Sequence, residues 1–146
     1  MSISIREITA ENFVEAIKLK VKKEQENFVA SNAASIAQSK FHTYLECHGI
    51  YYKDIMVGFA ATGKNPDDGE IWIARYMIGA QYQGKGYGKA GLQKIIEMLR
   101  TKWKCTSIFV NVEPENTVAK TLYEKVGFQD TGRIIGQKAL VLELKL

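Results

Sequence analysis

The stretch that decides the fold is EIWIARYMIGAQYQGKGYGKAGLQKIIEMLRTKW, which covers residues 70–103. Its first part, residues 70–79, is apolar on both faces apart from Arg75, as is typical of a strand buried in the middle of a sheet. A glycine-rich turn follows this strand. The remainder carries one apolar stripe at helical spacing, formed by Leu92, Ile95, Ile96, Leu99 and Trp103. The stretch therefore predicts a central strand, a glycine loop and an amphipathic helix in succession.

Upstream of this stretch, the pattern predicts one strand and two helices. Alternation over residues 2–8 indicates the strand, and Thr9 is expected to cap the helix that follows it. A second helix is predicted from the cap Asn32 to a stop at Gly49. The apolar positions of the two helices are Phe13, Ile17, Val21, Ile36, Phe41, Tyr44 and Leu45.

A hairpin and the C-terminal half complete the order of elements. Residues 49–52 and 55–62 are rich in β-forming residues and are joined by two polar residues, which predicts an antiparallel hairpin. Downstream, a short helix is expected to end at Gly127. The remaining predicted strands are 107–112, 128–135 and 139–144. The resulting order, β-α-α-β-β-β-α-β-α-β-β, describes a mixed α/β sheet with about four helices.

Length and composition indicate one globular domain over residues 1–146. Apolar residues make up 46% and charged residues 25% of the chain, which excludes disordered, collagen-like and coiled-coil classes. Cys47 and Cys105 form no CxxC and have no nearby pair of histidines, so no disulfide framework and no metal site are expected. Without an export signal or an apolar span, a cytoplasmic location is predicted. The net charge of +4 permits a phosphate-bearing ligand without requiring nucleic acid.

The glycine-rich turn QGKGYG, residues 83–88, is the segment that most clearly indicates a ligand. Its glycines allow the backbone to approach a ligand, and free N–H groups at a helix N-terminus beside Lys85 and Lys89 would attract a phosphate. The dinucleotide fingerprint GxGxxG fails because Lys89 stands at its third glycine. The Walker pattern fails because Gly86 stands where Ser or Thr must hold magnesium. A turn that serves only chain geometry is the remaining alternative.

The same turn resembles the pyrophosphate loop, Q/R-x-x-G-x-G/A, of the GNAT superfamily of N-acetyltransferases. A second motif supports the resemblance, because Asn116 and the run LYEKVGF at residues 122–128 are similar to that family's signature on the next helix. The resemblance implies a GNAT fold, with a mixed, mostly antiparallel sheet split by a V-shaped gap, and an acyltransferase that uses acetyl-CoA. The cofactor is expected in the gap between the strands at 70–79 and 107–112.

The resemblance also implies which residues bind coenzyme A. Backbone N–H groups of residues 83–89 would hold the pyrophosphate, and the strand backbone at 76–78 would pair with pantetheine. The lysines near the loop would either meet phosphates or be solvated surface charges. The implied cofactor-binding residues are Tyr76, Met77, Ile78, Gln83, Gly84, Lys85, Gly86, Tyr87, Gly88, Lys89, Asn116, Tyr123 and Lys125, with no metal ligand.

Amine acetylation needs a neutral amine, a polarised thioester carbonyl and a proton for the departing thiolate. Tyr123 is the predicted acid, because a phenol pKa near 10 lies close to that of a thiol, about 8.5; its alternative is a packing role. A backbone N–H near Met77 or Ile78 would polarise the carbonyl. Glu70 is the predicted base, acting through water, and its alternative is a solvated strand end. Arg75 either pairs with a carboxylate or faces the site.

Acidic and aromatic side chains of the first two helices and the hairpin form the predicted acceptor site, because a cationic amine favours such groups. An ordinary amphipathic surface is the alternative. The candidates are Glu24, Glu26, Phe28, Phe41, Tyr44 and Glu46, with Arg75 beside them. The runs at residues 25–32 and 75–78 are similar to the bacterial spermidine/spermine N-acetyltransferase branch. Gly79 and Gln137 depart from that branch, which usually has acids at both positions.

The resemblance therefore implies transfer of an acetyl group to a primary amine, such as spermidine or spermine, by direct attack in a ternary complex. The alternatives are an N-acetyltransferase for a protein, peptide or aminoglycoside amine, or a non-catalytic regulator that binds coenzyme A. The expected partner is a small-molecule amine, rather than nucleic acid or a membrane. Pairing of two copies into a homodimer through an exposed terminal strand is also expected.

Overall fold

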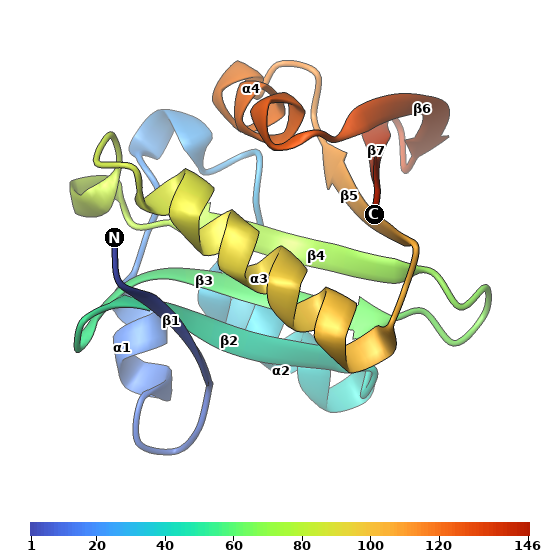
Figure 1. Ribbon diagram of the computed structural model, residues 1–146. Coiled ribbons are helices and arrows are strands. Elements are labelled where there is room, and N and C mark those ends of the chain that lie inside the picture. Colours follow the sequence, from blue (N-terminus) through green and yellow to red (C-terminus); the bar gives the residue numbers. More distant parts are fainter.

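A seven-stranded sheet runs through the molecule in the order β1-β2-β3-β4-β5-β7-β6, as the computed structural model of residues 1–146 shows (Figure 1). Its strands are β1 (Ile3–Glu7), β2 (Leu45–Tyr52), β3 (Ile55–Lys64), β4 (Ile71–Ile78), β5 (Ser107–Val112), β6 (Gln129–Ile135) and β7 (Ala139–Lys145). Every neighbouring pair is antiparallel except β4 and β5, which are parallel. This confirms the mixed, mostly antiparallel sheet, with the predicted central strand in its middle.

Four α-helices and two short 3₁₀ turns surround the sheet. They are α1 (Phe13–Lys18), η1 (Lys23–Gln25), α2 (Asn32–Phe41), η2 (Ala80–Tyr82), α3 (Tyr87–Trp103) and α4 (Thr117–Val126). In Figure 1, α3 crosses the front of the sheet, while α1 and α2 lie behind it. The sheet is therefore covered on both faces, which explains why β3 and β4 are apolar on both sides.

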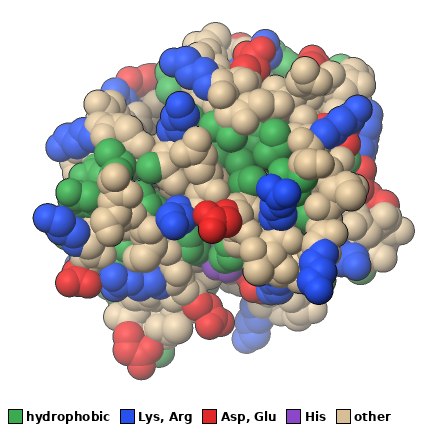
Figure 2. All heavy atoms as spheres, viewed as in Figure 1, with side chains coloured by type: hydrophobic (Ala, Val, Ile, Leu, Met, Phe, Trp, Pro, Cys, Tyr) green, Lys and Arg blue, Asp and Glu red, His purple; other side chains and the backbone are tan.

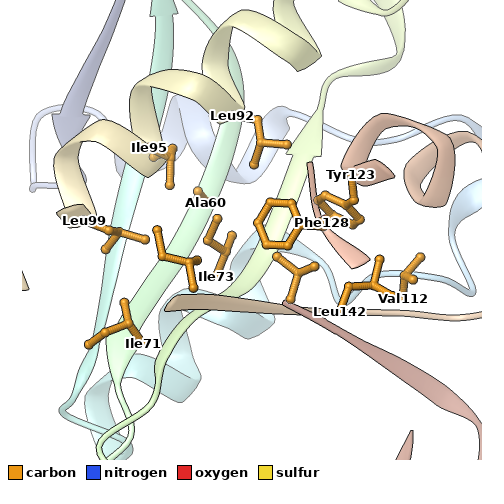
Figure 3. Packing of buried hydrophobic residues seen from close by; sticks show 12 residues of the cluster. Ala60, Ile71, Ile73, Leu92, Ile95, Leu99, Val112, Tyr123, Phe128 and Leu142 are labelled. Atoms are coloured by element: carbon orange, nitrogen blue, oxygen red, sulfur yellow. The ribbon is translucent and has the colours of Figure 1, made fainter. Parts of the chain in front are cut away.

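The main core lies between α3, the sheet and α4. Figure 3 shows Leu92, Ile95 and Leu99 of α3 facing the strands, with Tyr123 and Phe128 at the other end of the same cluster. This stripe on α3 follows the predicted helical spacing. A second cluster on the opposite face includes Ala16, Leu19, Phe59 and Met77.

The sheet splits where β4 and β5 part. Their parallel pairing consists of Trp72 with Phe109 and Ile73 with Val110. Immediately beyond these pairs, the β3–β4 register shifts so that Ala74 is an extra residue in β4. Such a bulge bends a strand and increases its twist. The predicted V-shaped gap therefore opens from Ala74 onward.

Two helix predictions in the N-terminal half are wrong at their ends. The first helix does not follow a Thr9 cap, because the Asn12 side chain accepts the N–H of Thr9 at 2.7 Å and the helix begins at Phe13. It ends at Lys18, so Val21 lies outside it. The second helix is capped by Ser31 rather than by Asn32.

The second helix also ends earlier than predicted. It stops at Phe41, and Leu45 already belongs to β2, so Tyr44 is not helical. Gly49 is a packing position inside β2, because a Cβ there would lie 2.8 Å from the Tyr51 side chain. Packing within the sheet, rather than the end of a helix, therefore accounts for the glycine at position 49.

Candidate active site

The gap between β4 and β5 contains two adjoining cavities. The first, here called the gap cavity, has a volume of 510 Å³ and lies among β4, β5, α4 and residues 26–30. The second, the loop cavity, has a volume of 690 Å³ and extends along the glycine loop, residues 83–89, and α4. Both are lined by Phe28, Val29, Tyr76, Asn116, Ala119 and Tyr123. Because they share these walls, the two cavities are adjacent, and together they are called the cleft.

The glycine loop offers free backbone donors to the loop cavity. The N–H groups of residues 84–89 donate no hydrogen bond within the protein. Gly84 and Gly86 have φ values of +76° and +89°, which favour glycine. Free N–H groups at the start of a helix as long as α3 attract anions, and Lys89 and Lys125 line the same cavity. The loop therefore suits a phosphate-bearing group.

The molecular surface in front of the loop cavity is also both apolar and cationic. Figure 2 shows an apolar area between α3 and α4 with Lys and Arg side chains at its borders. An apolar surface with a cationic border suits a ligand that combines phosphates with a long uncharged arm.

The free edge of β4 supplies further backbone groups. The N–H of Gly79 donates to the carbonyl of Val57 at 2.9 Å, so Gly79 is paired with β3. Hydrogen-bonding direction alternates along an antiparallel strand, and the main-chain groups of Tyr76 and Ile78 therefore point toward the gap. The carbonyl of Ile78 accepts a hydrogen bond from the Gln83 side chain at 2.9 Å. This edge can pair with an extended ligand.

Two tyrosines, the buried Tyr123 and the half-buried Tyr76, line both cavities where these adjoin. Tyr123 on α4 is 6% exposed, packs edge-on against Phe128, and makes no hydrogen bond through its hydroxyl. Burial raises the pKa of Tyr123, so its hydroxyl stays protonated. The Tyr76 hydroxyl donates to the carbonyl of Gly88 at 2.6 Å. The neutral Tyr123 hydroxyl is therefore free to donate a hydrogen bond to a ligand, whereas the Tyr76 hydroxyl already donates to the carbonyl of Gly88.

Asn116 caps α4 at the same junction. Its side-chain oxygen accepts the N–H of Ala119 at 3.4 Å, and the residue lines both cavities. Of the sequence-predicted cofactor set, only Lys85 and Tyr87 are absent from the wall of the loop cavity. The Tyr87 ring instead packs against Tyr52, with centroids 5.2 Å apart.

The structure does not bring Glu70 to the cleft. Glu70 precedes β4 at the end of the strand away from the gap, and it accepts two hydrogen bonds from the Arg133 guanidinium, at 2.7 and 3.2 Å. Neither cavity includes it in its wall. A carboxylate held in a bidentate ion pair outside the cleft is a poor base for an amine inside it.

The predicted acceptor residues do not converge either. Glu26, Phe28 and Arg75 line the gap cavity, but Glu24 does not. The remaining candidates lie outside the cleft: Phe41 is 79% exposed, Tyr44 packs against His42, and Glu46 pairs with Lys102.

Gly79 and Gln137, the two positions that depart from the polyamine branch, have different surroundings. A Cβ at Gly79 would lie 2.8 Å from the Leu19 side chain, so an acid there would require the Leu19 side chain to move. Gln137 is exposed in the turn between β6 and β7. Neither residue lines the gap cavity.

Two polar groups at the cleft escaped the sequence reasoning. Asn111 interrupts the otherwise apolar strand β5 and lines the gap cavity, which is a signal that the pattern did contain. Gln25 is hydrogen-bonded to Gln83 of the glycine loop, 58 positions away. No local pattern could indicate that contact.

No group of three or more His, Cys, Asp or Glu side chains is arranged to hold a metal ion. None of the helices combines the length and the apolar character that crossing a membrane would require.

The sheet with its gap, the free N–H groups of the glycine loop and the tyrosine at the cavity junction define an acyltransferase of mixed α/β fold. The acetyltransferase (GNAT) family model matches residues 4–128, and the chain belongs to this family. Its members are acyltransferase enzymes, which confirms the class predicted from the two motifs.

Known proteins agree with this placement. The chain is 34% identical to the spermine/spermidine N(1)-acetyltransferase of Bacillus subtilis (strain 168), over 99% of this chain and 100% of that protein. Two solved structures are similar in fold. A spermidine N-acetyltransferase from Vibrio cholerae, in complex with CoA and spermine, has a TM-score of 0.79 at 14% identity, covering 98% of this chain and 95% of that one. An aminoglycoside acetyltransferase in complex with coenzyme A has a TM-score of 0.82 at 16% identity, covering 99% and 95%.

Proposed function

We propose that this enzyme transfers the acetyl group of acetyl-CoA to a primary amine of a polyamine such as spermidine or spermine. The observation that carries the proposal is the cleft, in which the free N–H donors of the glycine loop line one cavity and the hydroxyl-bearing Tyr123 lines both. The full-length similarity to a spermine/spermidine acetyltransferase supports the polyamine as acceptor.

The loop cavity fits coenzyme A on its own geometry. Residues 84–89 offer consecutive unpaired N–H groups, and the positive φ of Gly84 and Gly86 shapes them into a concave surface. The gap-facing edge at Tyr76 and Ile78 would pair with the amide groups of pantetheine, as an added strand does. When bound, acetyl-CoA supplies an acetyl group activated as a thioester.

The residues at the junction would assist a direct attack in a ternary complex. The neutral Tyr123 hydroxyl would donate a hydrogen bond to the departing thiolate and then its proton, although burial raises its pKa further from that of a thiol than the sequence alone predicts. A main-chain N–H at the free edge of β4 would stabilise negative charge on the carbonyl oxygen. The amine would approach from the gap cavity, where Glu26 and Phe28 favour a cation.

A panel of amines tests the proposal, with release of the coenzyme A thiol as the readout. Spermidine and spermine should have the highest kcat/KM, above an aminoglycoside, a lysine-bearing peptide and a simple monoamine. Selective turnover of the peptide or the aminoglycoside would replace the polyamine by that acceptor. Binding of acetyl-CoA without turnover of any amine would instead indicate a regulator.

Three other expectations stay predictions: a single domain over residues 1–146, a cytoplasmic location and a homodimer. The exposed edge strand β6, with Ile134 and Ile135 on its surface, is the segment we propose for dimer contact.

A further inference from the structure

The gap cavity contains one fixed positive charge that no carboxylate neutralises. The Arg75 guanidinium donates to the carbonyl of Ala74 at 2.8 Å and to the side-chain oxygen of Gln38 at 3.2 Å. Its Nε is buried and has no hydrogen-bond partner. No Asp or Glu oxygen lies within 4.0 Å of it, because every ion pair of the protein involves other residues.

The other ionisable groups of this cavity are few. Glu26 is its one carboxylate and is exposed, whereas Arg75 is half-buried in β4. Tyr76 and Tyr123 complete the set, and burial raises the pKa of both hydroxyls, so neither carries charge at neutral pH. No histidine lines the cavity. The positive charge of Arg75 therefore dominates the inner part of this space.

The same cavity lacks an evident base. A primary amine has a pKa of about 10.4, so it is almost fully protonated at pH 7 and cannot attack a thioester. Glu70 is held by Arg133 outside the cleft, and Glu26 at the exposed side would stabilise the charged amine rather than the neutral one. The enzyme must therefore obtain the neutral amine in another way.

We propose that Arg75 makes a general base unnecessary, because its positive charge lowers the pKa of the acceptor amine in the gap cavity. This inference rests on the proposed acetyltransferase function. A cavity of 510 Å³ is about 10 Å across, so a bound ammonium lies within a Debye length of its wall, and the half-buried Arg75 is screened less than an exposed charge would be. Nearby cationic groups activate amines in this way in other enzymes.

The proton balance of the step is simple. The bound ammonium gives one proton to water, and its lone pair then attacks the thioester carbonyl carbon. The C–N bond forms, the C–S bond breaks, and Tyr123 protonates the thiolate. The second N–H proton is lost as the amide forms and replaces the proton that Tyr123 gave. One proton is released for each acetyl group transferred.

The charges of Glu26 and Arg75 also determine how the acceptor is oriented in the gap cavity. Glu26 attracts the ammonium groups that stay charged, while Arg75 repels charge from the group that enters. The specific acceptor class is therefore a di- or polyamine whose remote ammonium lies near Glu26 while its terminal amine, neutral, lies near Arg75.

The test is the pH profile of kcat at saturating acetyl-CoA and saturating amine, with the best amine of the panel, because kcat reports the pKa values of the bound complex. In Arg75→Met, the rising limb should move up by about one pH unit, so that kcat falls about tenfold at pH 7 and recovers at high pH. Arg75→Lys keeps the charge and should stay close to wild type. Gln38→Ala, which removes a partner of Arg75 but no charge, is the matched control and should not move the limb. Glu26→Gln removes a negative charge at an exposed residue and should move the rising limb to lower pH. It tests the effect of the cavity charges on the pKa of the amine even if Arg75→Met fails to fold.

A second readout separates charge from structure. With a weakly basic amine that is already neutral at pH 7, Arg75→Met should cost less than twofold. An equal loss for both amines, at every pH, would overturn the proposal and leave Arg75 with a structural role. Failure of wild type to acetylate polyamines would reject the proposed acceptor but not this inference, because the profile is measured with whichever amine is turned over.

Discussion

The side-chain amides of Gln25 and Gln83 exchange two hydrogen bonds: Gln83 Nε2 donates to Gln25 Oε1 at 2.9 Å, and Gln25 Nε2 donates to Gln83 Oε1 at 3.2 Å. Gln83 begins the glycine loop, whereas Gln25 belongs to η1, just before residues 26–30 of the gap cavity wall. The pair therefore joins the wall of one cavity to the loop that forms the other.

We expect Gln25→Ala to weaken both substrates together. Both hydrogen bonds to Gln83, about 1 kcal/mol each, are lost, together with the one that Gln25 Oε1 accepts from the N–H of Lys22 at 3.0 Å. KM for the amine and for acetyl-CoA should therefore each rise several-fold, with a smaller change in kcat. Initial-rate kinetics with each substrate varied would measure this. Glu24→Ala, one position away at an exposed side chain with no hydrogen bond, is the control. An effect on the amine alone would contradict the coupling.

Gly86→Asp should abolish coenzyme A binding while leaving the fold intact. Gly86 has φ of +89°, and a carboxylate there would repel phosphate from the free N–H groups. Isothermal calorimetry should show an affinity loss of about 100-fold or more. Gly132→Asp is the matched control, because Gly132 also has positive φ, +80°, but lies in open space on β6. Equal losses in the two variants would reject the phosphate role.

Tyr123→Phe should separate binding from turnover. The substitution removes a hydroxyl that makes no hydrogen bond in the protein, so coenzyme A affinity should stay near normal while kcat falls about 100-fold. Single-turnover thiol release and calorimetry on the same samples would measure both. Tyr52→Phe provides the control for loss of a hydroxyl elsewhere. A kcat within twofold of wild type would mean that water protonates the thiolate.

The two buried hydroxyls also predict a loss of stability in alkali. Burial raises the pKa of Tyr123 and of Tyr76 above the value of about 10 that each has in the unfolded chain. Above pH 10 the unfolded chain therefore ionises first and is favoured, and the free energy of unfolding should fall as pH rises. Urea unfolding between pH 8 and pH 11 would measure the slope, which should be shallower in Tyr123→Phe than in wild type.

Glu70→Gln should leave catalysis unchanged. The carboxylate is engaged by Arg133 outside both cavities, so kcat/KM should stay within twofold of wild type. Loss of this partly exposed ion pair should lower the free energy of unfolding by about 0.5–1 kcal/mol. Arg133→Gln breaks the same pair and should match it in activity, but it should lower the free energy of unfolding further, because the Arg133 guanidinium also lies 5.6 Å from the centroid of the Phe109 ring. A 100-fold loss of activity confined to Glu70→Gln would restore the predicted base.

The sequence predicted best where the signal was local. The apolar β4, the glycine loop and the stripe of α3 follow one another without interruption, and all three appear at the expected residues. The ends of the N-terminal helices are predicted less well because several short polar residues compete to cap them. The Asn32 side chain instead donates to the carbonyls of Ala16 and Leu19, and that of Asn12 donates to the Tyr51 hydroxyl, contacts that only the folded chain provides. Tertiary packing decided these boundaries.

In the candidate site too, local motifs are predicted better than contacts between residues distant in sequence. Residues that lie within one motif, such as Gln83 and Gly86, reach the loop cavity together. The surroundings of Glu70 and Arg75 depend on Arg133 and on Gln38, which are distant in sequence. Composition alone grouped Phe41 and Tyr44 with the acceptor residues, but the early end of α2 places both outside the cleft.

Strands β4 and β5 pair over only a short length, so helix α3 is the element that holds the two halves of the sheet together. Strands β1 to β4 are connected by antiparallel pairs, as are β5, β7 and β6, but only two residue pairs link these sets. Leu92, Ile95 and Leu99 pack in one cluster with Ile73 of β4 and with Val110 of β5. The helix therefore packs on both halves of the sheet and holds them together, while β4 and β5 diverge beyond their two paired residues. The width of the cleft is therefore a property of the hydrophobic core beneath it, set by side chains that no substrate touches.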